Sequence, residues 1–332
     1  MRFTLSNLPA VLITCLPLYG WWYNYGLIRF TLALLFIALL RQITVFLHIF
    51  RDKSDRSKMV LDATSSSHFV EKIRWTLDYL GADYEEEQNV STLRALLTGE
   101  TVPQLRVPAT GTKIGDSNDI ITFLLGKYGA ESKQRRKFLS PHKEAKKLTE
   151  LSDEIGELVK KIAYPAAFKA PDLEAVALKI FGFHQTEMIP GVQRKAIELL
   201  VPLLIRYIKW KVGDEAGLDT AEENAEKLLD LLVTFDDLLK DGREFLLEGT
   251  TEPSVVDIHF AAMLGPLLFS PNFGGKAVQE ESRVTPDDLG PEGKKFMDQM
   301  LKKVNKRKSV KFAKEMFDKY RFRVLEGAAA KK

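Results

Sequence analysis

The sequence predicts a mixed α/β domain followed by an all-helical domain, with a hydrophobic helical segment ahead of both. Strand-like and helix-like runs alternate between residues 58 and 129, which is typical of a small α/β domain. Apolar residues recur at helical spacing from residue 144 to residue 322. The first fifty residues are largely apolar and contain no Asp or Glu. A chain of 332 residues is long enough to form a core in each of two domains.

The hydrophobic segment predicts attachment to a membrane through residues 8–50, as one span or as a tight hairpin. Residues 27–50 are long enough for a span of about 20 residues, although Arg41 lies within them. Basic residues from Arg51 onward favour cytoplasmic folded domains by the positive-inside rule. Two alternatives stay open. The segment is an organelle-targeting sequence, or translation starts at Met59 and the protein is soluble and cytoplasmic.

The α/β domain opens with a strand over residues 61–64, three serines, and an amphipathic helix over residues 69–80 that Gly81 ends. The first N–H groups of a helix have no intrahelical partner and lie at the positive end of its dipole. Serines at this position therefore favour an anion. An ordinary serine N-cap explains the same residues taken alone.

The rest of the domain follows in a fixed order. Residues 102–107 predict a strand that begins with Val102-Pro103, and a turn at residues 110–112 leads into a short strand. Asp116 and Ser117 then cap a helix that runs to about Tyr128. A hydroxyl before the first helix, a Val-Pro, and an acidic-Ser pair before a later helix together resemble the thioredoxin-fold half of a soluble, cytosolic-type glutathione transferase.

The second half carries its own resemblance to the helical domain of this superfamily. Residues 245–249 read Phe-Leu-Leu-Glu-Gly, and Ser254 and Asp257 have the spacing of a capping box. The first helix and residues 151–164 resemble bacterial-type members. We therefore divide the chain as follows: 1–57, hydrophobic membrane-anchor or targeting segment; 58–129, thioredoxin-like glutathione-binding domain; 130–143, basic linker; 144–332, all-helical substrate domain.

The resemblance implies a site that binds glutathione as co-substrate. Ser67 would be the catalytic hydroxyl, with Ser65 and Ser66 as alternatives. The N–H of Phe69 or Val70 would add to the field at the sulfur. The remaining implied residues are Val102 and Pro103 for the cysteinyl backbone, Asp116 and Ser117 for the γ-glutamyl end, and Tyr164 and Phe168 for a hydrophobic electrophile.

Three features depart from the family pattern. His68 stands where many relatives have proline, and we expect it to be exposed in the first turn. Val70 stands where redox-active relatives have a second cysteine, so a protein thiol takes no part in the reaction. Gly99-Glu100-Thr101 supplies no basic residue for the glycyl carboxylate, which leaves Arg94 or another basic side chain for that role.

The sequence thus predicts a transferase that stabilises the glutathione thiolate for attack on hydrophobic electrophiles. The alternative is a noncatalytic, membrane-associated interaction protein of the same fold. The five histidines and the single Cys15 have no metal-ligand spacing, so we expect no metal. The basic run at residues 131–147 lacks interleaved aromatic residues, so we expect no nucleic acid partner. The resemblance also implies that a homodimer can form.

Overall fold

The computed structural model describes residues 57–88, 102–139, 143–180, 201–202, 205–206, 209 and 217–325. The predicted membrane segment at residues 8–50 lies outside these residues, as does part of the stretch with helical apolar spacing, between residues 181 and 216. Within the described ranges, no helix combines the length and the apolar character needed to cross a bilayer.

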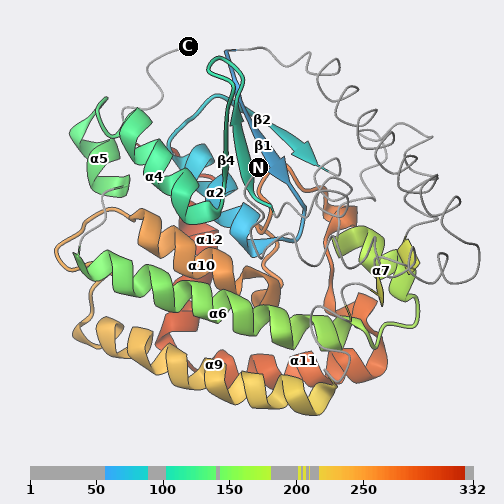
Figure 1. Cartoon of the computed structure of the whole chain (residues 1–332). Helices are drawn as coiled ribbons and strands as arrows, with labels where there is room; N and C mark the ends of the chain where they lie inside the picture. Colours follow the sequence, from blue (N-terminus) through green and yellow to red (C-terminus); the bar gives the residue numbers. More distant parts are fainter. Residues whose placement is uncertain are drawn as a thin grey trace, which may run out of the picture.

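The N-terminal domain is built on a mixed sheet whose strands lie in the order β2-β1-β3-β4 (Figure 1). The central strand β1 pairs in parallel with β2 and antiparallel with β3, and β3 pairs antiparallel with β4. Their bounds are Met59–Ala63, Tyr84–Gln88, Gln104–Val107 and Thr112–Gly115 in chain order. The sequence prediction contained β1, β3 and β4 but not β2.

Two helices of this domain carry the predicted site. Helix α2 (His68–Tyr79) begins at the Ser67 N-cap, and the chain leaves it through Gly81 at a φ of 62°. Helix α4 (Ser117–Tyr128) begins at the Asp116 N-cap. Helix α4 starts where the sequence predicted and α2 starts one residue earlier than predicted, because side-chain oxygens at their N-caps accept hydrogen bonds from first-turn N–H groups.

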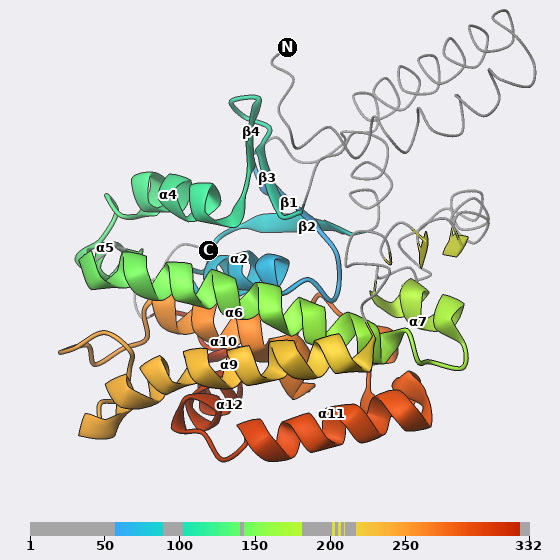
Figure 2. The same cartoon turned by 60° about the horizontal axis from the view of Figure 1, so that its bottom comes forward.

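The C-terminal domain is all-helical (Figure 2). Its α-helices are α6 (Lys143–Ala167), α7 (Leu173–Ile180), α9 (Leu218–Leu238), α10 (Val255–Leu268), α11 (Gly290–Val304) and α12 (Lys308–Tyr320). Short 3-10 turns lie at Leu239–Asp241, Glu280–Ser282 and Pro286–Leu289. Between the domains, α5 (Lys133–Leu139) occupies part of the basic stretch that the sequence analysis treated as a linker.

Helix α10 lies at the centre of the molecule and joins the two domains. It packs against α6 and α12 of its own domain and against α2 of the other. All its residues except Pro266 are buried, and a helix that is apolar on every side needs such an environment. Ser254 and Asp257 form a capping box at its start, and Asp257 also accepts the Leu246 N–H at 2.7 Å. Burial raises the pKa of Asp257.

The last part of the stretch with helical apolar spacing, from residue 290 to residue 320, consists of two helices. Helix α11 ends at Val304, and α12 begins at Lys308 after a short break. The break turns the chain so that α12 packs on α10 and α9 while α11 packs on α6. Asp236 of α9 fixes the new helix start by accepting the Ser309 N–H at 2.8 Å.

Candidate active site

Among the described residues, the Ser67 hydroxyl accepts a hydrogen bond and has no acceptor for its own proton. Its Oγ accepts a hydrogen bond from the Val70 N–H at 3.3 Å, as an N-cap does. An oxygen that accepts in this way keeps its own proton for another partner. The side chain is partly exposed, so a ligand can reach it.

The neighbouring serines are placed differently. Ser66 donates its hydroxyl to the carbonyl oxygen of Ile180 at the end of α7, so its proton is committed to the protein. Ser65 is almost fully buried behind the turn. Of the three serines that the sequence offered, the geometry favours Ser67.

The Val102-Pro103 peptide bond is cis. Asp62 of β1 lies opposite Gln104 of β3, so the antiparallel register continued by two residues brings Val102 opposite Thr64. The Val-Pro turn and the turn before α2 therefore meet at the same end of the sheet, as the family resemblance implied. Phe69 lies beside them in the first turn of α2.

Asp116 and Ser117 start α4 in an unusual local conformation. Asp116 has a φ of 71°, and its carboxylate accepts the Asn118 N–H at 2.7 Å. Ser117 is 5% exposed and points inward, where its Oγ accepts a hydrogen bond from the Lys72 ammonium at 3.2 Å. Because Lys72 only donates, Ser117 keeps its own proton to donate to an anion.

Lys72 begins a chain of polar contacts that crosses from one domain to the other. Its ammonium also donates to Asn118 Oδ1 at 2.6 Å, and Asn118 Nδ2 donates to Asp153 Oδ2 at 3.0 Å. Asp153 lies on α6, and its other oxygen is 2.8 Å from His259 Nε2 on α10. We call Lys72, Asn118, Asp153 and His259 the interdomain relay. The sequence analysis assigned a role to none of these side chains.

The charges of the interdomain relay follow from burial. Lys72 is 1% exposed, and burial lowers its pKa to about 8 although Asp153 and Asp116 favour the charged form. Burial, with the charge of Lys72, lowers the pKa of His259 to about 4. Burial alone would raise the pKa of Asp153, but the His259 hydrogen bond and Lys72 lower it to about 2. At neutral pH a neutral His259 therefore donates from Nε2 to an ionised Asp153.

His68 is buried, so the expectation that it is exposed was wrong. It is 7% exposed, and its Nε2 has no hydrogen-bond partner among the described residues. A Cβ added at Gly156 of α6 would lie 3.0 Å from the ring, so the glycine makes room for it. Burial, with the charge of Lys160, lowers the pKa of His68 to about 3. His68 is therefore a neutral packing residue at the domain boundary.

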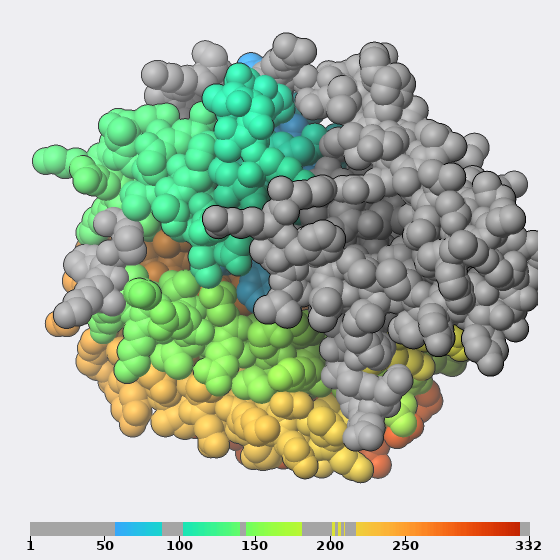
Figure 3. Space-filling model, in the orientation of Figure 1, coloured from blue at the N-terminus to red at the C-terminus, as the bar shows by residue number. Residues whose placement is uncertain are grey.

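Along helix α6, a polar side chain near the middle of the helix is followed by an aromatic pair at its C-terminal end. Asp153 joins the relay, Gly156 lies against His68, and Tyr164 follows roughly 16 Å along the helix from Asp153. Tyr164 and Phe168 stack with ring centroids 6.1 Å apart, and the Lys209 ammonium is 5.4 Å from the Phe168 centroid. In Figure 3 the surface of α4 and β4 lies above that of α6, and a small part of the blue β1-α2 segment shows between them.

No cluster of metal-ligating side chains occurs among the residues that the structure describes. The groups that the candidate site offers are hydroxyls, helix N–H groups and one buried cation. This set can bind a carboxylate and can stabilise a thiolate.

These features define a class: a thioredoxin-like domain joined to an all-helical domain, as the resemblance implied, with a cis-proline in the first of the two. Residues 62–132 match the family model of the glutathione S-transferase N-terminal domain. The matched stretch coincides with the α/β domain and supports the cytosolic glutathione transferase superfamily. No curated protein shows a significant sequence match.

Solved structures that this chain resembles include the following three proteins. Ure2p5 from Phanerochaete chrysosporium, cocrystallized with 1-(S-glutathionyl)-2,4-dinitrobenzene, has 13% identity and a TM-score of 0.41, over 80% of this chain and 96% of that one. The beta-etherase LigF from Sphingobium has 18% identity and a TM-score of 0.42, over 79% and 99%. A glutathione S-transferase from Methylobacterium radiotolerans, in complex with glutathione sulfonate, has 16% identity and a TM-score of 0.38, over 77% and 94%. Similarity at this level supports no conclusion about activity.

Proposed function

We propose that this protein is a serine-type glutathione transferase that acts on hydrophobic electrophiles. The observation that carries the proposal is the pair of polar groups that helix α2 and its N-cap place at the site. Helix α2 presents the Ser67 hydroxyl at its first turn and, on the same helix, the Lys72 ammonium bonded to Ser117. These groups match the thiol and the γ-glutamyl carboxylate of one glutathione molecule.

Ser67 would stabilise the sulfur. A free thiol has a pKa of about 8.5, so little of it is ionised at neutral pH. A hydrogen bond to a charged acceptor is worth about 1.5–3 kcal/mol, which lowers the thiol pKa by about one to two units. The thiol proton leaves to solvent, and the thiolate forms a carbon-sulfur bond with the electrophile. A leaving group departs with its electron pair or, in an addition, the product carbanion takes up a proton.

The γ-glutamyl end would lie at the start of α4. Ser117 would donate its hydroxyl to the ligand carboxylate, with the Lys72 charge 3.2 Å from the serine oxygen. Asp116, at the helix start, would bind the ligand ammonium. Val102, before the cis-Pro103, would pair its backbone with the cysteinyl residue.

The order of groups along α6 supports the placement of the electrophile. Asp153 lies beside the γ-glutamyl position, and the Tyr164-Phe168 pair lies further along the chain, past the Gly156 that contacts His68. An apolar electrophile against this pair would lie on the far side of the thiolate from the γ-glutamyl group. Arg94, which the sequence offered for the glycyl carboxylate, lies outside the described residues.

The test is ultraviolet difference absorbance of glutathione thiolate bound to the full chain at pH 7. We expect a thiolate signal with wild type and with the control Ser66→Ala, and its loss in Ser67→Ala. An unchanged signal in Ser67→Ala would remove the serine from the mechanism. No signal from folded wild-type protein would favour the noncatalytic alternative.

A further inference from the structure

The first residue after α12 reaches back to the helix that carries the proposed site. Arg321 is 1% exposed, and its Nε donates to Glu71 Oε1 at 2.6 Å, 250 residues earlier in the chain. Its Nη1 donates to Asp78 Oδ2 at 2.8 Å. The guanidinium carbon lies 5.5 Å from the centroid of the Trp75 ring. One side chain thus contacts three residues on one side of α2.

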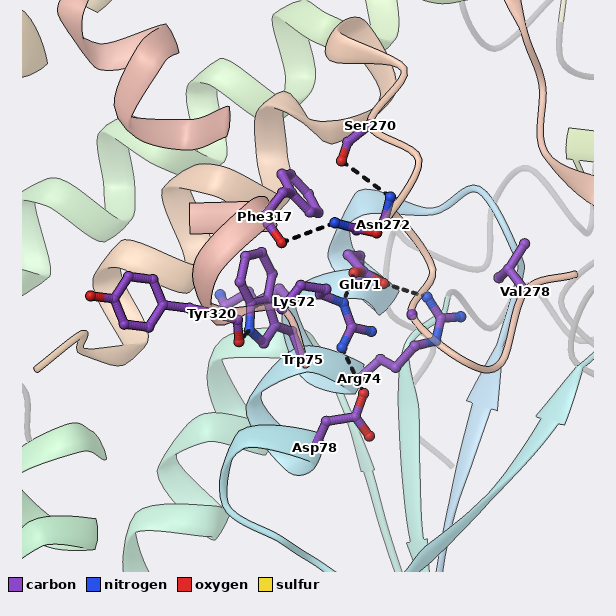
Figure 4. Close-up of polar contacts among 12 residues, drawn as sticks. Glu71, Lys72, Arg74, Trp75, Asp78, Ser270, Asn272, Val278, Phe317 and Tyr320 are labelled. Atoms are coloured by element: carbon purple, nitrogen blue, oxygen red, sulfur yellow. Dashed lines mark hydrogen bonds and ion pairs between the residues drawn. The ribbon is translucent and has the colours of Figure 1, made fainter. Parts of the chain in front are cut away.

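The backbone around Arg321 makes two further contacts with the same helix. The Trp75 indole N–H donates to the Tyr320 carbonyl at 3.3 Å, and the Leu325 N–H donates to the Tyr79 carbonyl at 2.7 Å. Figure 4 shows Glu71, Trp75 and Asp78 facing the end of α12. We call residues 320–325 the C-terminal strap.

The pocket around Arg321 fits its guanidinium closely. A Cβ added at Gly275 would lie 2.1 Å from Nη2, so only glycine leaves room there. Nη2 is buried and has no hydrogen-bond partner among the described residues. An unpaired buried donor is costly, and buried ion pairs are often no more stable than apolar replacements. These contacts are therefore better explained by a need to fix the position of α2 than by a contribution to stability alone.

The contacts of the strap lie next to the proposed site. Glu71 directly precedes Lys72, and three residues separate it from Ser67. A small shift of α2 on the side of the strap would therefore move both the hydroxyl and the buried ammonium. Misplacement of about 1 Å by a remote mutation can lower a rate by about a hundredfold.

We propose that Arg321 is a positioning residue, which sets the placement of α2 and thereby that of Ser67 and Lys72. The proposal rests on the proposed function where it concerns glutathione. It also makes a statement about α2 that can be measured without any ligand.

The experiment compares the full chain as wild type, Arg321→Met and Arg321→Lys. Arg323→Met is the matched control, because Arg323 lies in the same strap and its ion pair with Glu252 is exposed. The Met variant is expected to fold, since Glu71 keeps its 2.7 Å ion pair with Arg74 and Asp78 keeps the Tyr84 hydroxyl. The Lys variant retains a cation and covers the case in which the Met variant does not fold.

Two readouts separate positioning from general stability. In Arg321→Met we expect the pKa of bound glutathione thiol to rise by about one unit, and kcat/KM with 1-chloro-2,4-dinitrobenzene to fall roughly tenfold to a hundredfold. Arg321→Lys should give intermediate values, and Arg323→Met should match wild type. A lower melting temperature with an unchanged thiol pKa and unchanged kcat/KM would overturn the proposal.

Amide hydrogen exchange keeps the two proposals distinguishable. We expect faster exchange in the first turn of α2 in Arg321→Met, with α10 unchanged. A uniform increase across α2 and α10, or no increase in α2, would overturn the role of Arg321. Absence of thiolate from wild type would instead overturn the proposed function, while the exchange result would still decide whether Arg321 places α2.

Discussion

Replacing Lys72 by Met should make stability and glutathione binding change in opposite directions. Burial lowers the pKa of Lys72 from its model-compound value of 10.5 to about 8, which means that the folded protein holds this charge unfavourably. Each pKa unit corresponds to about 1.4 kcal/mol, so holding the charge at pH 7 costs roughly 3 kcal/mol. The ammonium nevertheless supplies a charge-assisted hydrogen bond to the site, worth about 1.5–3 kcal/mol.

The sign of the pH effect follows from linkage. Between pH 8 and pH 10.5 the unfolded state binds more protons at this lysine than the folded state does, so wild-type stability rises with pH. The variant lacks this group. The wild-type free energy of unfolding, relative to that of Lys72→Met, should therefore rise by roughly 2.5 kcal/mol from pH 7 to pH 10. Hydrogen bonds lost on replacement add a constant that does not alter this slope.

The assay is urea denaturation of the ligand-free full chain at several pH values, together with glutathione titration at pH 7. Lys161→Met serves as control, because Lys161 is exposed on α6. Lys72→Met should bind glutathione about tenfold more weakly or worse. A flat stability difference for Lys72→Met would refute the view that Lys72 is a destabilising buried cation.

Two further predictions concern the domain boundary and the centre of the helical domain. Burial lowers the pKa of His68 to about 3 and that of His259 to about 4, so the folded state loses stability as pH falls from the unfolded pKa of 6.5 toward those values. Each histidine should remove roughly 1.6 kcal/mol between pH 6.5 and pH 5. His68→Gln should reduce that loss in an acid denaturation series, whereas an identical pH profile would contradict the prediction. Asp257→Ala should lower the free energy of unfolding, measured by urea denaturation, by about 2–4 kcal/mol, because the buried N–H groups of Leu246 and Ser254 lose their acceptor. A change below about 0.5 kcal/mol would show that the cap is dispensable.

Local patterns predicted the elements whose cause is local. The Ser67 cap and the apolar spacing of residues 70, 73 and 77 are sufficient to place α2. The Asp116-Ser117 pair likewise placed α4. Strand β2 could not be found in this way, because Tyr84–Gln88 contains three consecutive glutamates. Arginines far along the chain or on another element neutralise two of them: Arg74 pairs with Glu86, and Arg106 with Glu87.

The interdomain relay and the burial of His68 depend on contacts between distant segments. His68 is buried because Gly156, 88 residues later, leaves space for its ring. In the sequence, Lys72 has the pattern of a surface lysine on an amphipathic helix. In the structure α10 also packs against α2, so that helix is covered on more than the side facing the sheet. A sequence signal existed only for Asn118, which follows the two capping residues directly. Pairing that spans two domains leaves no periodic pattern in either one.

The C-terminal strap can pack on α2 only late in the synthesis of the protein. Glu71 emerges from the ribosome 250 residues before its partner Arg321. At about 5–20 residues per second, the ribosome needs roughly 12 to 50 seconds to make the intervening chain. During that time the α/β domain can form its sheet, but one side of α2 stays open to solvent and to chaperones. A nascent chain that stalls before residue 321 would therefore leave Glu71, Trp75 and Asp78 without the cation that contacts them in the folded protein.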